Sequence, residues 1–357
     1  MWQWVEIPDQ FEYARTEAED LAADLERAHS TMLRTEINDR EDILLKPDGR
    51  LRLTDNMLTL LAVKQMCTLM AAGLWQYVAD VGGIVRRKLL SDEAMSPELA
   101  INTLNSSIDL RAEVEGGLVG RHMICDTEAE TVDGIVGAKY QYLAHTQLYE
   151  IVSEMLLAAD QPSEFYAATR IGRLLAMDFL RPINFMNYGD TPLFAGHYFR
   201  NSEAGEGGVK SAIIIQVGIG KLRCMSKLIS VPHVGRKFTN KLGRMLASTT
   251  DTDNLLAHLQ ATAVRTLDTE IPLITDDNQV DGEYRKSLVK HLNMAGADNA
   301  FVESVIAKVE LLDGPITVWN VFYELIAGAV WLHPTDREKA EHVAFQILTG
   351  TLKLEEL

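Results

Sequence analysis

The chain has 357 residues, 47% of them hydrophobic and 24% charged, which excludes a wholly disordered, collagen-like or mucin-like protein. Its formal net charge of −17 repels nucleic acid and anionic lipid at long range, so an anion-binding surface has to be a local one. No apolar run reaches the ~18 residues that a membrane span needs, and the acidic N-terminus does not resemble a signal peptide, so we expect a cytoplasmic protein without a membrane partner.

The N-terminal segment, residues 1–95, is predicted to be helical. Residues 14–37 carry apolar side chains at helical spacing with acids between them, which is typical of an amphipathic helix packed on a core. Thr54 or Asp55 is expected to cap a second helix that continues to about Leu74.

The middle segment, residues 96–250, is predicted to be an α+β core. A short strand is expected at 119–124, and the clearest helical spacing covers 131–156. The apolar run at 170–180 fits either a strand or a helix, and the Gly and Pro residues of 188–192 indicate a turn. Together with the strands that follow, these elements predict a small antiparallel sheet flanked by helical N-terminal and C-terminal segments.

Positive charge is concentrated within this core. Between Arg200 and Met245 there are nine Lys or Arg residues and two acids, a net charge of +7, so the rest of the chain carries −24. Residues 211–219 and 221–231 are predicted to pair as a β-hairpin. Alternation along the second strand predicts one cationic face and one core face. The cationic face is Lys221, Arg223, Met225 and Lys227, and the core face is Leu222, Cys224 and Leu228.

A helix is expected to follow the hairpin from about Arg236. Apolar and basic side chains repeat at helical spacing on two adjoining stripes, so one stripe is predicted to be buried and the other exposed. The buried stripe is Phe238, Leu242 and Met245, and the exposed stripe is Lys237, Lys241 and Arg244. The hairpin and this helix are therefore predicted to present a basic surface together.

The C-terminal segment, residues 251–357, is predicted to be helical throughout. Amphipathic helices are expected at 255–267, 301–309 and 338–348. Residues 318–331 are apolar nearly all round, which indicates a helix buried in protein.

Motifs that would indicate catalysis or a cofactor are absent from the sequence. Residues 205–211 are rich in glycine, but Val209 precedes the lysine and a strand follows, so a hairpin loop is expected rather than a phosphate loop. The polar loop at 277–283 lacks the ligand pattern of a calcium site. The three cysteines and the histidines show no metal-ligand spacing, and we expect reduced thiols, no cofactor and no enzymatic activity.

Several short motifs are similar to a known family. They are residues 201–205 (Asn-Ser-Glu-Ala-Gly), the strand pair that contains Arg223 and Cys224, and residues 233–236 (His-Val-Gly-Arg). Supporting matches are Leu110-Arg111-Ala112, the Tyr140 to Leu148 helix, Tyr188-Gly189-Asp190 and Leu53-Thr54-Asp55.

Over roughly residues 53–348 the chain thus resembles the phage- and plasmid-borne family that has domain of unknown function 932. One departure is that Met225-Ser226-Lys227 stands where the family has a Thr-Asn-Gly turn. The resemblance implies a mobile-element origin, a bacterial host cell and no established activity. Phage genes of this sort often serve replication or recombination, and a basic hairpin followed by a helix is similar in plan to single-strand annealing proteins.

The leading hypothesis is therefore an oligomeric phage-type protein that binds single-stranded DNA. The alternative is a non-enzymatic assembly or inhibitor protein whose basic segment docks on an acidic surface of another copy or of a host protein. A third possibility is an enzyme with scattered catalytic residues. The predicted nucleic-acid contacts are Arg200, Lys210, Lys221, Arg223, Lys227, Arg236, Lys237, Lys241 and Arg244.

Overall fold

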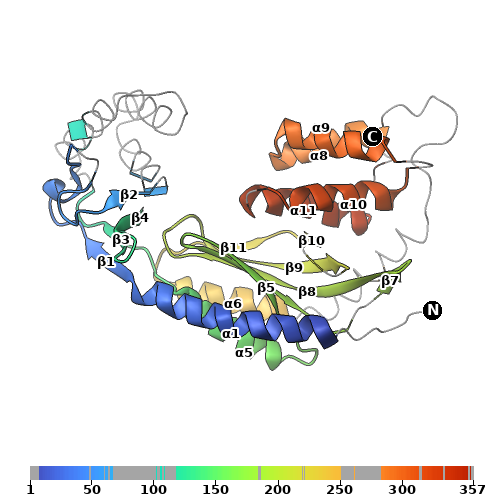
Figure 1. Ribbon diagram of the computed structural model, residues 1–357, viewed down its shortest axis with the longest axis horizontal. Helices are drawn as coiled ribbons and strands as arrows, with labels where there is room; N and C mark the ends of the chain where they lie inside the picture. The colour runs from blue at the N-terminus through green and yellow to red at the C-terminus, as the bar shows by residue number, and fades with distance from the viewer. Residues whose placement is uncertain are drawn as a thin grey trace.

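The computed structural model describes residues 8–47, 50–59, 118–183, 186–218, 222–250, 283–312, 316–332 and 334–352, with isolated positions elsewhere. Within them the chain has the predicted α+β class (Figure 1). Helices cover both faces of a seven-stranded sheet, and a four-stranded sheet lies at one end of the same described part of the molecule (Figure 1).

The larger sheet confirms and extends the antiparallel sheet predicted around residues 170–231. Hairpin connections join β5 to β6 and β8 to β9, and β6 pairs with β8 to unite the two hairpins. β10 and β11 both pair with β9, while β7 pairs with the start of β8. The bounds are β5 (Glu164–Ile171), β6 (Leu174–Leu180), β7 (Met186–Tyr188), β8 (Thr191–Ser202), β9 (Val209–Val217), β10 (Arg223–Met225) and β11 (Ile229–Val231).

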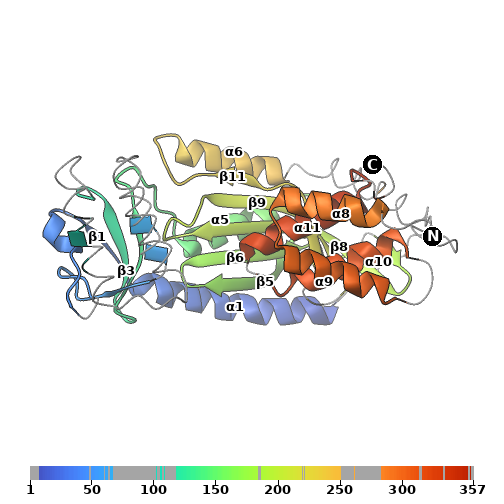
Figure 2. The same ribbon diagram turned by 90° about the horizontal axis from the view of Figure 1, so that it is seen from above.

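Three helices cover one face of this sheet (Figures 1 and 2). They are α1 (Pro8–Ser30), α5 (His145–Leu157) and α6 (Phe238–Thr250). Buried aromatic rings from three strands meet the helices there, with Phe165 edge-on to Phe179 at 5.8 Å and Phe179 edge-on to Phe199 at 6.0 Å between ring centroids. This apolar layer holds α6 in place, because Phe238 and Leu242 belong to the same buried cluster.

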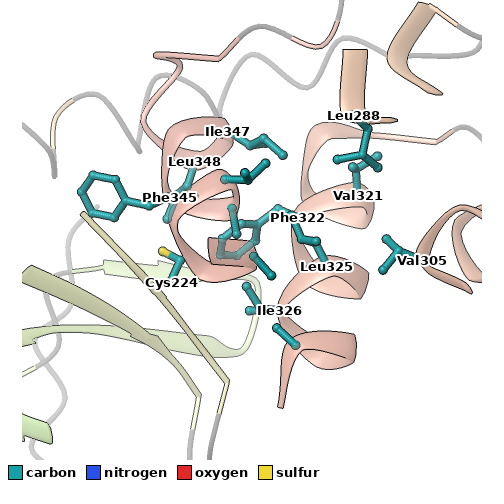
Figure 3. Packing of buried hydrophobic residues seen from close by; sticks show 14 of the residues in the cluster. Cys224, Leu288, Val305, Val321, Phe322, Leu325, Ile326, Phe345, Ile347 and Leu348 are labelled. Carbon is teal, nitrogen blue, oxygen red and sulfur yellow. The ribbon is translucent and has the colours of Figure 1, made fainter. Parts of the chain in front are cut away.

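The C-terminal helices cover the opposite face (Figure 1). They are α8 (Glu283–Ala295), α9 (Asn299–Glu310), α10 (Val318–Ala329) and α11 (Pro334–Leu348), which confirms the helices predicted at 301–309, 318–331 and 338–348. Phe322 is fully buried among them, and Cys224 of β10 joins their apolar cluster beside α11 (Figure 3). α11 is therefore the helix that lies directly on the β9 and β10 side of the sheet.

The smaller sheet stands at the end of the molecule where α1 finishes (Figure 1). Its spatial order is β1 (Met32–Glu36), β3 (His122–Asp126), β4 (Thr131–Val136) and β2 (Met57–Leu58). The strand predicted at 119–124 is confirmed as β3 with a shift of its ends.

Two helix predictions are partly wrong in this region. Residues 131–136 form β4, so only α5 confirms the second part of the helix predicted at 131–156. A Cβ on Gly134 would lie 2.5 Å from the carbonyl oxygen of Ala204, so β4 packs against the β8 end more closely than other residue types permit. The helix predicted at 14–37 ends at Ser30, because the following residues pair with β3.

The helix expected from Thr54 or Asp55 also begins later. Residues 57–58 form β2, and Thr59 then accepts a hydrogen bond from the backbone N–H of Ala62 through its hydroxyl. The remainder of that helix and the helix predicted at 255–267 lie outside the described residues.

Arg173, at the β5–β6 turn, ties the two sheets together. Its guanidinium lies 2.8 Å from Asp126 of β3 and 2.7 Å from Asp133 of β4. It also lies 3.6 Å from Glu203, just after β8, and donates to the carbonyl of Ala28 in the last turns of α1. Burial acts to lower the pKa of this guanidinium, but the surrounding carboxylates raise it, so the side chain stays charged.

Replacing Arg173 with Ala is expected to destabilise the protein by about 3–5 kcal/mol, because at least two carboxylates lose their buried counter-charge. Urea unfolding measures the change. Arg27→Ala is the control: Arg27 pairs with Asp24 at 2.9 Å but is 73% exposed, so its loss should cost under about 1 kcal/mol. Equal costs for the two variants would contradict the role given to Arg173.

Candidate nucleic-acid interface

Eight of the nine predicted cations lie in the described residues, and they separate into a group that is buried or half-buried under α11 and an exposed group. Arg200, Lys210 and Arg223 lie in an ionic layer between the larger sheet and α11. Lys221 lies outside the described residues. The exposed group is Lys227, Arg236, Lys237, Lys241 and Arg244.

Two of the buried cations share one carboxylate. Arg200 of β8 and Lys210 of β9 are paired across the ladder, and each approaches Glu338 of α11 at 2.9 Å. The hydroxyl of Tyr198 donates to the same carboxylate at 2.8 Å. Arg200 is 3% exposed, so the prediction that it contacts nucleic acid is wrong, while Lys210 is half-buried and already has a carboxylate partner.

Arg223 of β10 is buried by the same helix. It pairs with Asp178 of β6, approaches Glu341 of α11 at 3.1 Å and lies 4.8 Å above the ring of Tyr198. Burial raises the pKa of Asp178 and of Glu341, and Arg223 opposes both shifts. A side chain held in this way cannot reach a nucleic acid, so this part of the predicted interface is also wrong.

The prediction that the second hairpin strand has a cationic, exposed face is wrong for a physical reason. Arg223, Cys224 and Met225 are all buried. The alternating pattern predicted that one face of this strand is exposed to solvent, but α11 covers that face. Lys227 is exposed, but it follows the end of β10 and is not part of the strand.

The prediction for the following helix is confirmed. In α6 the stripe of Phe238, Leu242 and Met245 is buried, while Lys241 and Arg244 are exposed. Arg236 and Lys237 are exposed just before the helix begins, and none of these four cations forms an ion pair with a carboxylate in the part of the chain that the structure describes. We name Arg236, Lys237, Lys241 and Arg244 the α6 surface.

The hairpin cations and the α6 surface do not converge. α6 lies on the face of the larger sheet opposite to α11, whereas Arg200, Lys210 and Arg223 point to α11 (Figure 1). The single basic surface predicted from the sequence is therefore wrong: among its described cations, the α6 surface and Lys227 are exposed, and Arg200, Lys210 and Arg223 are held under α11.

A cleft lies where the two sheets meet and leads to the start of α6. Its volume is about 480 Å³, and its lining includes Val136 of β4, Tyr140, the glycines of the β8–β9 loop, and residues 232–234. The segments on its two sides are joined by backbone hydrogen bonding: Tyr140 forms a β-bridge with Val234, and the N–H of Gln141 donates to the carbonyl of His233 at 2.6 Å.

The cleft brings together two of the three sequence motifs on which the family resemblance rests. Residues 201–205 end β8 and enter the glycine loop, while residues 233–236 connect β11 to α6. The loop joins two antiparallel strands, which confirms a hairpin loop at the position compared with a phosphate loop. Gly205 has φ of +80°, and a Cβ there would lie 2.9 Å from Val136, so glycine is required on both grounds.

His233 is fixed in the wall of the cleft. Its ring stacks on Tyr140 at 5.0 Å and on Phe238 at 5.1 Å between centroids. Nδ1 lies 2.8 Å from the carbonyl oxygen of Gln141, so Nδ1 carries the proton and Nε2 is left as an acceptor. Nε2 is buried and has no hydrogen-bond partner in the described structure, and burial lowers the pKa of the ring.

The histidines do not gather into a metal site. Within the described residues no group of three or more His, Cys, Asp or Glu side chains could hold a metal ion. His145 instead lies beside the Arg173 carboxylates, with Nε2 3.9 Å from Glu203 and Nδ1 3.1 Å from the amide of Asn201. Cys125 and Cys224 are buried free thiols, as predicted, whereas Cys67 lies outside the described residues.

Comparisons of the chain with protein-family models, curated proteins and solved structures found no match. In the described part of the chain, no helix is long and apolar enough to cross a membrane.

Two parts of this arrangement could not be predicted from the sequence. Glu338 and Glu341, three residues apart on α11, neutralise strand cations more than a hundred residues away in the chain, and acids at that spacing are common on exposed helix faces. The cleft depends on contacts between β4 and the end of β8, and such long-range contacts cannot be predicted from the spacing of nearby residues. The two short motifs on its sides were the feature of the sequence that could have indicated it.

The stability of the protein is expected to fall as the pH decreases from about 6.5 to 4. Burial lowers the pKa of His145 from 6.5 to about 4, and Glu203 opposes the shift only in part. In this window His145 takes up a proton in the unfolded chain but stays neutral in the native protein. The free energy of unfolding therefore falls by up to ~1.4 kcal/mol per pH unit.

Because His122 and His233 shift in the same direction, the test compares His145→Gln with the unchanged chain. Urea unfolding across this window should give a flatter dependence of stability on pH for the variant. Equal slopes would contradict the burial of a neutral His145.

Proposed function

We propose that this protein binds single-stranded nucleic acid through the α6 surface. The observation that supports this best is that these four cations are exposed and form no ion pair with a described carboxylate, whereas Arg200, Lys210 and Arg223 have carboxylate partners. In a chain with a net charge of −17, carboxylates are abundant. Cations that none of the described carboxylates neutralises are therefore available to an anionic partner.

The extent of the α6 surface favours a flexible strand over a duplex. Lys237 and Arg244 are seven residues apart along the chain, which corresponds to roughly 10 Å of helix axis and to two or three phosphates. A rigid duplex would bring further phosphates against the acidic remainder of the protein, while a flexible strand can keep its phosphates near α6. Lys227, exposed after β10, could add one contact to the same strand.

The proposal is of a non-catalytic protein that works in the cytoplasm of a bacterial host on phage or plasmid DNA. The similarity of residues 201–205 and 233–236 to the phage- and plasmid-borne family supports this setting. Replication and recombination are the processes that supply single strands, and assembly into an oligomer would place several α6 surfaces along one strand.

Reversing the charge of Lys237 and Lys241 to Glu is expected to weaken binding of a labelled single strand and to flatten its salt dependence. Each phosphate contact on a single strand contributes about −0.7 to the slope of log affinity against log salt, so two or three contacts predict a slope of about −1.4 to −2.1, and losing most of them should bring the slope close to zero. Fluorescence anisotropy across a salt series measures both quantities.

The matched control is Lys286→Glu with Lys290→Glu. These lysines are also exposed and four residues apart, but they lie on α8, beyond the opposite face of the sheet (Figure 1). The control changes the net charge equally and should change the slope little. Binding without salt dependence, or an equal loss in both variants, would refute the proposal.

A second candidate is docking of the α6 surface on an acidic protein surface, including that of another copy. The observation in its favour is that two aliphatic side chains close to α6 in the sequence are exposed, Ile229 at 46% and Val234 at 52%. Light scattering without nucleic acid distinguishes the two. An oligomer that dissociates on Lys237→Glu with Lys241→Glu supports docking between copies, and an unchanged mass argues against it.

A further inference from the structure

The cleft beside α6 has walls that suit an uncharged, flat ligand. Val136, Tyr140 and Val234 contribute apolar surface, and Gly205 and Gly207 keep the loop free of side chains. Its volume of about 480 Å³ falls within the range of sites for small molecules. Gly207 has φ of +115°, and a Cβ there would meet no atom within 4 Å, so space remains at the loop.

The charges around the cleft argue against a phosphate as its occupant. Glu206 is one of the lining residues, and its carboxylate would repel a phosphate in this partly buried setting. A carboxylate instead accepts hydrogen bonds from N–H groups, as it does from the amino group of cytosine. His233 also lines the cleft, but its Nε2 is buried behind the wall, so Glu206 is the acceptor that faces a ligand.

The cations needed to hold phosphates stand immediately outside the cleft. Val234 lines it, and Arg236 and Lys237 follow two and three residues later at the start of the α6 surface. A strand bound along the α6 surface therefore carries its bases past the opening. A single strand can turn an unpaired base into such a site, whereas a duplex cannot do so without breaking a pair.

We propose that the cleft between Tyr140, the glycine loop and Val234 receives one unpaired nucleobase of the strand that the α6 surface binds. The inference rests on the proposed function and adds the recognition of a base to the binding of phosphates. The preferred base bears an exocyclic amino group, because the Glu206 carboxylate that lines the cleft is a hydrogen-bond acceptor. The phosphates remain outside with the cations.

The test compares two single strands of about 16 nucleotides, one of cytosine deoxynucleotides and one with the same backbone but without bases. Anisotropy at fixed salt should show the cytosine strand binding roughly tenfold more tightly. Val234→Trp, which fills the cleft from an exposed position, should reduce the affinity for cytosine to that for the abasic strand and leave the salt slope unchanged.

Ile229→Trp is the control, since Ile229 is similarly exposed on β11 and does not line the cleft. It should keep the tenfold preference, and thermal unfolding checks that both variants fold. Equal binding of the two strands by the unchanged protein would overturn the base site and leave the proposed function standing, and this comparison needs no variant. A tenfold preference retained by folded Val234→Trp would also overturn the base site, and binding of neither strand would refute both proposals.

Discussion

The ion pairs between α11 and the larger sheet decide which cations of this protein can meet a partner. Arg200, Lys210 and Arg223 lie under α11, where a buried charge is tolerated only when an opposite charge accompanies it. Glu338 and Glu341 supply that charge from a single helix face. These three hairpin cations thereby become part of the fold, and among the described cations of the predicted basic surface, Lys227 and the α6 surface stay exposed.

A second group of ion pairs, around Arg173, determines where the cleft lies. By holding β3, β4 and the end of β8 against one another, it places the smaller sheet beside the glycine loop. The close contact of Gly134 with Ala204 follows from the same arrangement. The cleft is thus a product of how the two sheets are joined, and it lies beside the segment that leads into α6.

The parts of this arrangement that depend on local spacing could be predicted from the sequence. The two stripes of α6 are one example, because a helix repeats every 3.6 residues and Phe238, Leu242 and Met245 mark its buried side. Alternation in β10 separates two faces but cannot say whether a second layer covers the polar one, and here α11 does. Residues 131–136 were mistaken for helix because the tertiary pairing that makes them a strand leaves little trace in a short apolar run.

We propose that the cations of α6, and not those of the hairpin, form the binding surface. Hydrogen–deuterium exchange of the backbone amides, with and without a single-stranded oligonucleotide, tests it most directly because it reports on both regions in one experiment. The claim predicts slower exchange over residues 235–244 when the strand is present, with β10 and α11 unchanged. Slower exchange in β10 or α11, with residues 235–244 unaffected, would contradict it.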